Sequence, residues 1–543
     1  MGKSLTETPL LQIRNLSVAF NGAEPVTRGV TFDLFKGTTT ALLGESGSGK
    51  SITSSAIMGL LPKGGEVVDG TVTHLPSGQC WIAPNGVIQA PLGQGLSMVF
   101  QDPMSSLNPS MRVGLQVTEV LMSHQERSKS ESRIRVEHLF EEVELPDPAL
   151  TFNKYPHELS GGQKQRIMLA IALAAEPEVL IADEPTTALD VTVQQSILAL
   201  LKKIQVQRGL AILFITHDLD VVRDIADTVL VLKDGGIVEQ GPIWKVFLHP
   251  EHPYTSALLD AQTRPQRIFK APGQKAYIEV QGVSKSFPVS RNLFGQVTDV
   301  FSAVRQVNAT IYRGERVGLV GESGSGKSTL GRLILGLTAA SEGSIMLDGQ
   351  PVLADDRKSM KRTRRLAQLV FQDPYSALNP HMRIGSALEE VLMHLGENRL
   401  TANKRAIALL EEVGLSEADA KRYPQSFSGG QRQRIVIARA LAMEPEFLVL
   451  DESVAALDVQ IQRSILDLLA TIGDERQLTF LFISHDLGVV QSFCNRLLVM
   501  QHGQLVETGD TSEIMNNPQH PYTQELLSSR AGKRSLEALE NNA

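Results

Sequence analysis

The sequence predicts two consecutive α/β domains, each with a mainly parallel sheet and helices on both of its faces. The octamer GESGSGKS occurs at Gly44–Ser51 and again at Gly321–Ser328. Three later landmarks recur at a constant offset of 268 residues: SGGQ (160 to 428), an Asp-Glu pair (183 to 451) and a histidine (217 to 485). In each half, short apolar runs alternate with helical stretches, which is the pattern of strands joined by crossover helices.

Apolar runs place the strands of both halves. An opening strand is expected over 10–20 and 277–287, and a second one over 39–43 and 316–320 runs into each octamer. Later runs, 179–182 and 447–450, end at the Asp-Glu pair, and 211–216 and 479–484 end at the histidine. Helices are expected after each octamer, across polar stretches such as 127–144, and after each SGGQ. The Gly- and Pro-rich segment 66–96 is interpreted as an accessory β-subdomain with a longer loop.

Length and repeat together set the domain organisation. The 543 residues suit two domains, each long enough to bury its own core. The first is expected over 1–262 and the second over 277–530. Between them, 263–276 contains prolines and basic residues and is interpreted as a linker, and 531–543 is a polar tail.

Charge and hydropathy exclude several classes of protein. The net charge of −8 argues against nucleic acid as the main partner, because phosphate backbones attract basic surfaces. The two cysteines, Cys80 and Cys494, lie far apart without ligand spacing, which fits a reducing compartment. We expect no signal peptide, because the N-terminus lacks a charged start followed by an apolar core. We also expect no membrane span, since no run of 18 apolar residues occurs, and a leading apolar run, 167–175, is cut by Glu176 and Pro177.

The octamer fits the pattern GxxxxGK[ST], which binds phosphate when it follows a strand and opens a helix. Its small residues let successive backbone N–H groups point at phosphate oxygens. Lys50 and Lys327 would bring positive charge to the β- and γ-phosphates, and the hydroxyls of Ser51 and Ser328 are suited to bind Mg²⁺. Two copies with the same downstream landmarks predict two nucleotide sites.

Acidic residues close another predicted strand in each half. Asp183 and Asp451 end apolar runs, where a carboxylate is expected to hold Mg²⁺. The adjacent Glu184 and Glu452 are the predicted bases for the attacking water. The paired histidines, His217 and His485, are each expected to contact a γ-phosphate.

SGGQ places two glycines at the start of a helix, where free N–H groups and the helix dipole face an anion. A P-loop already satisfies the phosphates of its own nucleotide. We therefore expect each SGGQ to serve the nucleotide that is bound to the other half.

Together, GESGSGKS, SGGQ, DEPTTALD (183–190) and the paired histidines resemble the ATP-binding-cassette ATPases over nearly the whole chain. For each half the resemblance implies a P-loop core with an antiparallel β-subdomain and a helical subdomain, and ATP and Mg²⁺ as cofactors. It also implies a head-to-tail pairing of the halves around two ATP molecules. Gln101 and Gln372 match a glutamine that senses Mg²⁺ and subunits. Phe20 and Phe287 resemble aromatics that stack on adenine, with core packing as the alternative.

The resemblance implies two composite ATP sites, each with its own Mg²⁺ ligands. The first site would combine Gly44, Glu45, Ser46, Gly47, Ser48, Gly49, Lys50, Ser51, Ile52, Gln101, Asp183, Glu184 and His217 with Ser428, Gly429, Gly430 and Gln431. The second would combine Gly321, Glu322, Ser323, Gly324, Ser325, Gly326, Lys327, Ser328, Thr329, Gln372, Asp451, Glu452 and His485 with Ser160, Gly161, Gly162 and Gln163. The expected Mg²⁺ ligands are Ser51, Gln101, Asp183, Ser328, Gln372 and Asp451.

A narrower resemblance rests on two repeated segments. QDPMSSLNP (101–109) and QDPYSALNP (372–380), with HPYT at 252–255 and 520–523, are similar to the peptide and nickel importer subfamily. The fused form resembles the ATPases of microcin C-type and glutathione-type peptide importers. This implies a motor that is peripheral to the cytoplasmic face of the bacterial inner membrane. Its partners would be two integral-membrane permease subunits, docking near 101–111 and 372–382, and indirectly a substrate-binding protein. HPYT is interpreted as a packing motif, with a metal site as the alternative.

Two other classes of twin-cassette protein fit less well. Translation factors that act on ribosomes typically carry a long charged helical linker, whereas segment 262–276 contains two prolines. DNA-repair or chromosome ATPases would need a long inserted coiled coil or zinc-binding cysteines, and the sequence contains neither. The cargo stays open among dipeptides, oligopeptides, antibiotic peptides, glutathione and metal chelates.

The second half departs from the DEPTTALD pattern. It reads DESVAALD, so that Ser453, Val454 and Ala455 replace the proline and two threonines while Glu452 is kept. Without proline, the backbone beside the predicted base is less restricted. Both sites are expected to be competent, and whether the Glu452 site is slower than the Glu184 site stays open.

Overall fold

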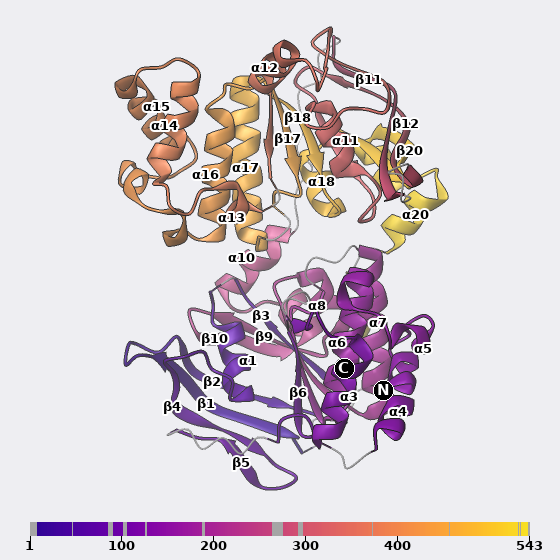
Figure 1. Cartoon of the computed structure of the whole chain (residues 1–543). Coiled ribbons are helices and arrows are strands. Elements are labelled where there is room, and N and C mark those ends of the chain that lie inside the picture. The colour runs from indigo at the N-terminus through magenta and orange to yellow at the C-terminus, as the bar shows by residue number, and fades with distance from the viewer. Residues whose placement is uncertain are drawn as a thin grey trace. The chain divides into compact units, whose positions relative to one another are not determined.

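The computed structural model describes residues 8–45, 47–84, 91–100, 106–124, 128–186, 191–262, 275–291, 297–371, 373–454, 457–529, 532 and 534–540. The chain forms two compact units (Figure 1). The first contains Met1–Thr263 together with Arg530–Ala543, and the second contains Arg264–Ser529. Residues 263–274 of the predicted linker lie outside the described part.

The first unit combines two sheets. The larger has the order β10-β9-β3-β8-β7-β6, all parallel except for β10, and the smaller is antiparallel with the order β2-β1-β4-β5. Its strands are β1 (Leu11–Phe20), β2 (Thr27–Leu34), β3 (Thr39–Leu43), β4 (Gly65–His74), β5 (Gln79–Ile82), β6 (Leu96–Val99), β7 (Val179–Asp183), β8 (Ala211–Thr216), β9 (Thr228–Lys233) and β10 (Gly236–Pro242). Its helices are α1 (Lys50–Met58), α3 (Val113–His124), α4 (Lys129–Glu142), α5 (Pro148–Thr151), α6 (Gly161–Leu173), α7 (Val191–Arg208), α8 (Leu219–Ile225), α9 (Ile243–Leu248), α10 (Pro253–Gln262) and α21 (Leu536–Glu540).

The second unit repeats this arrangement. Its sheets have the orders β20-β19-β13-β18-β17-β16 and β12-β11-β14-β15. Its strands are β11 (Ala276–Arg291), β12 (Val297–Tyr312), β13 (Arg316–Val320), β14 (Glu342–Leu347), β15 (Gln350–Pro351), β16 (Ala367–Val370), β17 (Phe447–Asp451), β18 (Thr479–Ile483), β19 (Arg496–Gln501) and β20 (Gln504–Asp510). Its helices are α11 (Lys327–Ile334), α12 (Arg357–Leu366), α13 (Pro374–Ala377), α14 (Ile384–His394), α15 (Arg399–Glu412), α16 (Gly429–Leu441), α17 (Val459–Arg476), α18 (Leu487–Phe493), α19 (Thr511–Asn516) and α20 (Pro521–Ser528).

Two adjacent residues of β3 show that helices cover both faces of the parallel sheet. Leu42 belongs to an apolar cluster with Ile57 of α1, whereas Leu43 belongs to a different cluster with Leu219 and Val222 of α8. Successive side chains of a strand point to opposite faces, so α1 and α8 lie on opposite sides. This confirms the predicted fold class.

The strands that precede the landmark motifs match the predictions closely. β3, β8 and β13 have the predicted bounds, and β7 and β17 extend one residue further, to the aspartate of the Asp-Glu pair. The largest difference is in β11, which continues to Arg291, beyond the predicted end at Phe287. Among the described residues, no helix is both long and apolar enough to cross a membrane.

Candidate functional site

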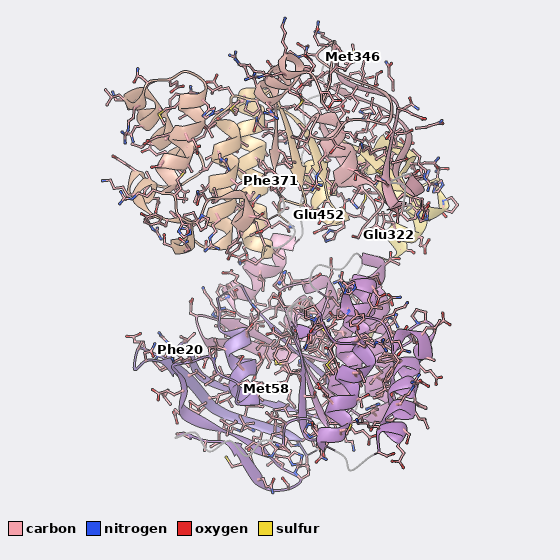
Figure 2. All side chains as sticks on the ribbon, viewed as in Figure 1. Phe20, Met58, Glu322, Met346, Phe371 and Glu452 are labelled. Carbon is pink, nitrogen blue, oxygen red and sulfur yellow. The ribbon has the colours of Figure 1, made fainter. Side chains whose placement is uncertain are left out.

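The order of the strands brings the landmark motifs to one edge of each parallel sheet. In the first unit, β8 lies between β3 and β7, and all three are parallel. Their carboxyl ends therefore meet at the same edge, where ligands bind in open α/β sheets. The octamer follows β3, the Asp-Glu pair closes β7, and His217 follows β8. In the second unit, Figure 2 shows Glu322 and Glu452 at the same end of the unit.

Each octamer forms a tight loop that opens a helix. Gly49 and Gly326, the residues before α1 and α11, have φ of 103° and 104°, which is unfavourable for other residues. A Cβ on Gly326 would also lie 2.2 Å from the carbonyl oxygen of Ala303. The Lys50 ammonium donates to the carbonyl oxygens of Gly44 and Glu45, both at 2.8 Å, and Lys327 repeats this pattern with Gly321 and Glu322. Each lysine thus lies over its own loop.

Asp183 is a buried carboxylate with spare capacity for a ligand. The residue is 7% exposed, and its Oδ1 has no hydrogen-bond partner within the described residues. Burial and the charge of Glu184 raise its pKa to about 6, although Ser51 and Lys50 act in the opposite direction. A buried oxygen without a partner is energetically unfavourable, and a cation would remove that penalty.

Asp451 occupies the same place in the second unit. Burial raises its pKa, and the Ser328 hydroxyl, which donates to its Oδ1 at 2.8 Å, opposes that rise. A hydroxyl and a carboxylate at this distance are the hard oxygen ligands that Mg²⁺ prefers. In both units, therefore, the serine and aspartate present fit a magnesium ion.

Glu184 and His217 form a pair at the end of the sheet. Nδ1 of His217 lies 2.9 Å from Oε1 of Glu184. Burial alone would lower the pKa of His217, but its contact with Glu184 raises the pKa above the usual value. The backbone of Glu184 has φ of 46°, while its N–H donates to Ile215 of β8 at 2.8 Å. A strained backbone held by a neighbouring strand fixes the direction of the carboxylate.

The second pair is similar but more open. Glu452 also has φ of 46°, so replacing the following proline with Ser453 leaves this backbone angle unchanged. The distance from Nδ1 of His485 to Oε1 of Glu452 is 3.5 Å. His485 lowers the pKa of Glu452, while the pKa of His485 is itself raised by Glu452 against the opposing effect of burial.

The SGGQ motifs begin α6 and α16 as capping boxes. The Ser160 hydroxyl accepts from the Gln163 N–H at 3.3 Å, and Gln163 Oε1 accepts from the Ser160 N–H at 3.1 Å. A Cβ on Gly162 would lie 2.6 Å from Val193 of α7, so close packing requires this glycine. Gly161 is exposed. The first glycine is thus the one that is open to an anion.

The two predicted adenine-stacking residues differ in their surroundings, and three other predicted residues lie outside the described part of the chain. The Phe20 ring packs on Gly65 at the edge of an apolar cluster, whereas Phe287 is exposed, with the Lys285 ammonium 5.2 Å from its ring centre. The exposed Phe287 ring is available for stacking on adenine, whereas the packed Phe20 ring is less available. Ser46, Gln101 and Gln372 lie outside the described residues.

The HPYT motif contributes a residue whose role sequence reasoning missed. His520 caps α20, and its Nδ1 accepts from the Tyr522 N–H at 3.2 Å. The buried Tyr522 accepts the backbone N–H of Glu322, in the second octamer, at 2.9 Å through its hydroxyl. The motif therefore supports the P-loop. Its recurrence in both halves was a usable signal, but only the fold shows which loop it reaches.

The P-loops and paired carboxylates of this fold define a twin P-loop ATPase. Two segments, 27–187 and 304–455, match the family model described as ABC transporter. Residues 238–281 and 506–540 match the model described as Oligopeptide/dipeptide transporter, C-terminal region. The chain belongs to the ABC transporter family, as the sequence motifs predicted.

Relatives match over the full length of the chain. "Peptidoglycan transport ATP-binding protein YejF" of Agrobacterium fabrum is 44% identical, covering 100% of this chain and 99% of the relative. "Glutathione import ATP-binding protein GsiA" of Pectobacterium atrosepticum is 40% identical, covering 97% and 90% respectively. A solved structure, cbiO1 from Clostridium perfringens, is 27% identical with a TM-score of 0.40, over 45% of this chain and 92% of that one.

Proposed function

We propose that this chain is the ATP-hydrolysing motor of an importer for peptides or peptide-like compounds. It would work at the cytoplasmic face of the inner membrane with two integral-membrane permease subunits and, indirectly, a substrate-binding protein. The observation that carries this proposal is the match of both C-terminal regions to the oligopeptide/dipeptide transporter region. Two of the relatives are named for peptidoglycan transport and for glutathione import, which supports a peptide-like cargo.

The proposed chemistry uses the residues at the sheet edge. Lys50 and Lys327 bind the β- and γ-phosphates, exchanging loop carbonyls for phosphate oxygens. Ser51 with Asp183, and Ser328 with Asp451, would hold Mg²⁺, which neutralises phosphate charge when bound. Gln101 and Gln372, which lie outside the described residues, remain proposed ligands.

Glu184 Oε is the proposed acceptor of a proton from the attacking water, and Glu452 is its counterpart. His217 fixes Oε1 of Glu184 through the 2.9 Å contact, and its raised pKa favours the imidazolium form, which suits a group facing phosphate. The 3.5 Å contact at His485 orients Glu452 less firmly. We therefore propose that ATP turnover is slower at the Glu452 site than at the Glu184 site.

Each SGGQ is proposed to complete the nucleotide site of the other unit. Ser160 and Gly161 are exposed at the start of α6, and that helix end is free for an anion. Ser160→Arg would place a bulky side chain there. Nucleotide trapping at the Lys327 site should fall more than trapping at the Lys50 site. The reverse order would contradict the head-to-tail pairing.

A groove in the second unit is the proposed permease contact. It measures about 350 Å³ and lies between the parallel sheet and the helical part. The exposed Leu337 and Phe371 line it, as does Val391 of α14, and the exposed Met393 follows two residues after Val391 in that helix. Phe371 is labelled in Figure 2. The first unit exposes apolar residues at the equivalent positions, Leu60, Phe100 and Met122, and all six residues are 43–50% exposed. Repeated exposure of large apolar side chains at the same three positions favours docking of a short amphipathic permease helix.

Membrane sedimentation with the permeases tests this contact. Leu337→Asp should reduce the membrane-bound fraction about tenfold, because a charge would be buried at the interface, while basal turnover is retained. Leu400→Asp is the matched control, since Leu400 is 80% exposed but does not line the groove. Equal loss in both variants would count against the groove. Sedimentation of the wild-type chain with ribosomes instead of membranes would support the translation-factor class.

A further inference from the structure

The C-terminal segment packs onto the first unit, although it follows the second unit in the chain. The second unit ends at Ser529, and the segment that follows belongs to the first. Its helix, α21, packs on α9. Leu536 is 2% exposed, in an apolar cluster that contains Leu219 and Val222 of α8. Burial of a large apolar side chain stabilises such a contact.

Polar groups fix the register of this segment. The backbone N–H groups of Gly532 and Arg534 donate to the two carboxylate oxygens of Asp224, at 2.8 and 3.1 Å. In return, Nε of Arg223 donates to the carbonyl oxygen of Arg534 at 3.2 Å. The Arg534 guanidinium lies 3.6 Å from Oδ1 of Asp227. At the other end, His249 Nε2 and Glu540 Oε1 are 2.9 Å apart.

The fit at Gly532 is steric as well as polar. Its φ is 87°, which residues with a Cβ rarely adopt, and a Cβ there would lie 2.4 Å from Oδ1 of Asp220. The site on the first unit thus recognises the main chain of the segment at close range.

The second unit keeps neither the charged residues nor the histidine of this binding site at the equivalent positions. At the offset of 268 residues, Asp220, Arg223, Asp224, Asp227 and His249 correspond to Gly488, Gln491, Ser492, Asn495 and Asn517. The apolar positions are retained, since Leu219 and Val222 correspond to Leu487 and Val490. The two cassettes share the apolar residues at these positions but differ in the residues that bind the segment. This difference indicates a binding site that is specific to the first cassette.

The binding site includes the helix that follows the catalytic histidine. His217 is followed by Asp218, whose side chain caps α8 by accepting the N–H groups of Asp220 and Val221. Asp224 is in the last turn of the same helix. We propose that the C-terminal segment is an intramolecular ligand of the first cassette, which holds α8 and so positions His217 at one of the two ATP sites.

Hydrogen exchange of the full chain tests the docking without any reference to transport. Ending the chain at Ser529 should make the amides of α8 exchange about tenfold faster, because their opening is no longer opposed. The amides of α18, the equivalent helix, are the internal control and should not change. In the full chain, Asp224→Ser should accelerate exchange in both α8 and 532–540, whereas Ser492→Ala should not. Unchanged exchange in α8 after truncation would overturn the docking.

A second measurement tests the positioning of His217 and rests on the proposed ATPase function. In a Glu452→Gln background, only the first site would turn over, and truncation at Ser529 should lower this rate about three- to tenfold. In a Glu184→Gln background, truncation should leave the rate unchanged. Equal effects in the two backgrounds, or none in either, would overturn the positioning role. Because the exchange experiment needs no catalysis, failure of the ATPase assignment would be recognised separately.

Discussion

Asp183 gives the most direct physical prediction, because its proposed function opposes stability. In the absence of a cation, a buried carboxylate beside Glu184 destabilises the folded first unit, as the raised pKa of Asp183 records. Asp183→Asn keeps the shape of the side chain and removes its charge. We expect this variant to be more stable than the wild type at pH 7 in buffer without nucleotide or Mg²⁺.

The magnitude follows from the pKa. The rise from 3.8 to about 6 is roughly two units, and each unit corresponds to about 1.36 kcal/mol. The folded form binds more protons than the unfolded form between these values, so stability falls as pH rises from about 4 to 6. The expected gain at pH 7 is therefore about 3 kcal/mol at most. At roughly 2–4 °C per kcal/mol for a unit of this size, the melting temperature rises by about 6–12 °C at most.

Thermal unfolding at a series of pH values measures this effect. The difference in melting temperature between Asp183→Asn and the wild type should be small near pH 4 and grow up to pH 7. Glu119→Gln, at an exposed position of α3, is the matched control and should shift the curve little. Saturating Mg²⁺ and ATP should reverse the order, because the variant lacks a metal ligand. A difference that does not depend on pH, or a variant less stable than the wild type at pH 7, would refute the reasoning.

Two further substitutions probe the proposed base of the first site and the support of the second P-loop. Glu184→Gln should lower turnover at the first site by about 10² or more, measured with the second site disabled by Lys327→Ala, because a general base is lost; undiminished turnover would rule out that role. Tyr522→Phe should weaken binding of a fluorescent ATP analogue at the Lys327 site by about three- to tenfold, since one hydrogen bond of about 1 kcal/mol to the P-loop is lost while the ring still packs. Unchanged affinity with a lower melting temperature would instead assign Tyr522 a purely structural role.

The sequence by itself determined the local parts of this protein. An apolar run followed by small residues and a lysine specifies a strand, a phosphate loop and a helix, because backbone sterics and helix capping act within a few residues. The same holds for the capping box at Ser160. The recurrence of these segments established two cassettes and paired each predicted catalytic residue with its counterpart in the other half.

Only the tertiary structure decided which of these parts meet. Strand pairing places β8 between β3 and β7, and thereby brings His217 to Glu184. Close helix packing explains Gly162, which the motif alone attributed to anion binding. The contacts of Tyr522 with a P-loop 200 residues away, and of Arg534 with Asp227, join residues that are distant in the chain. Such contacts follow from how a whole domain buries its apolar surface, and no short stretch of sequence contains that information.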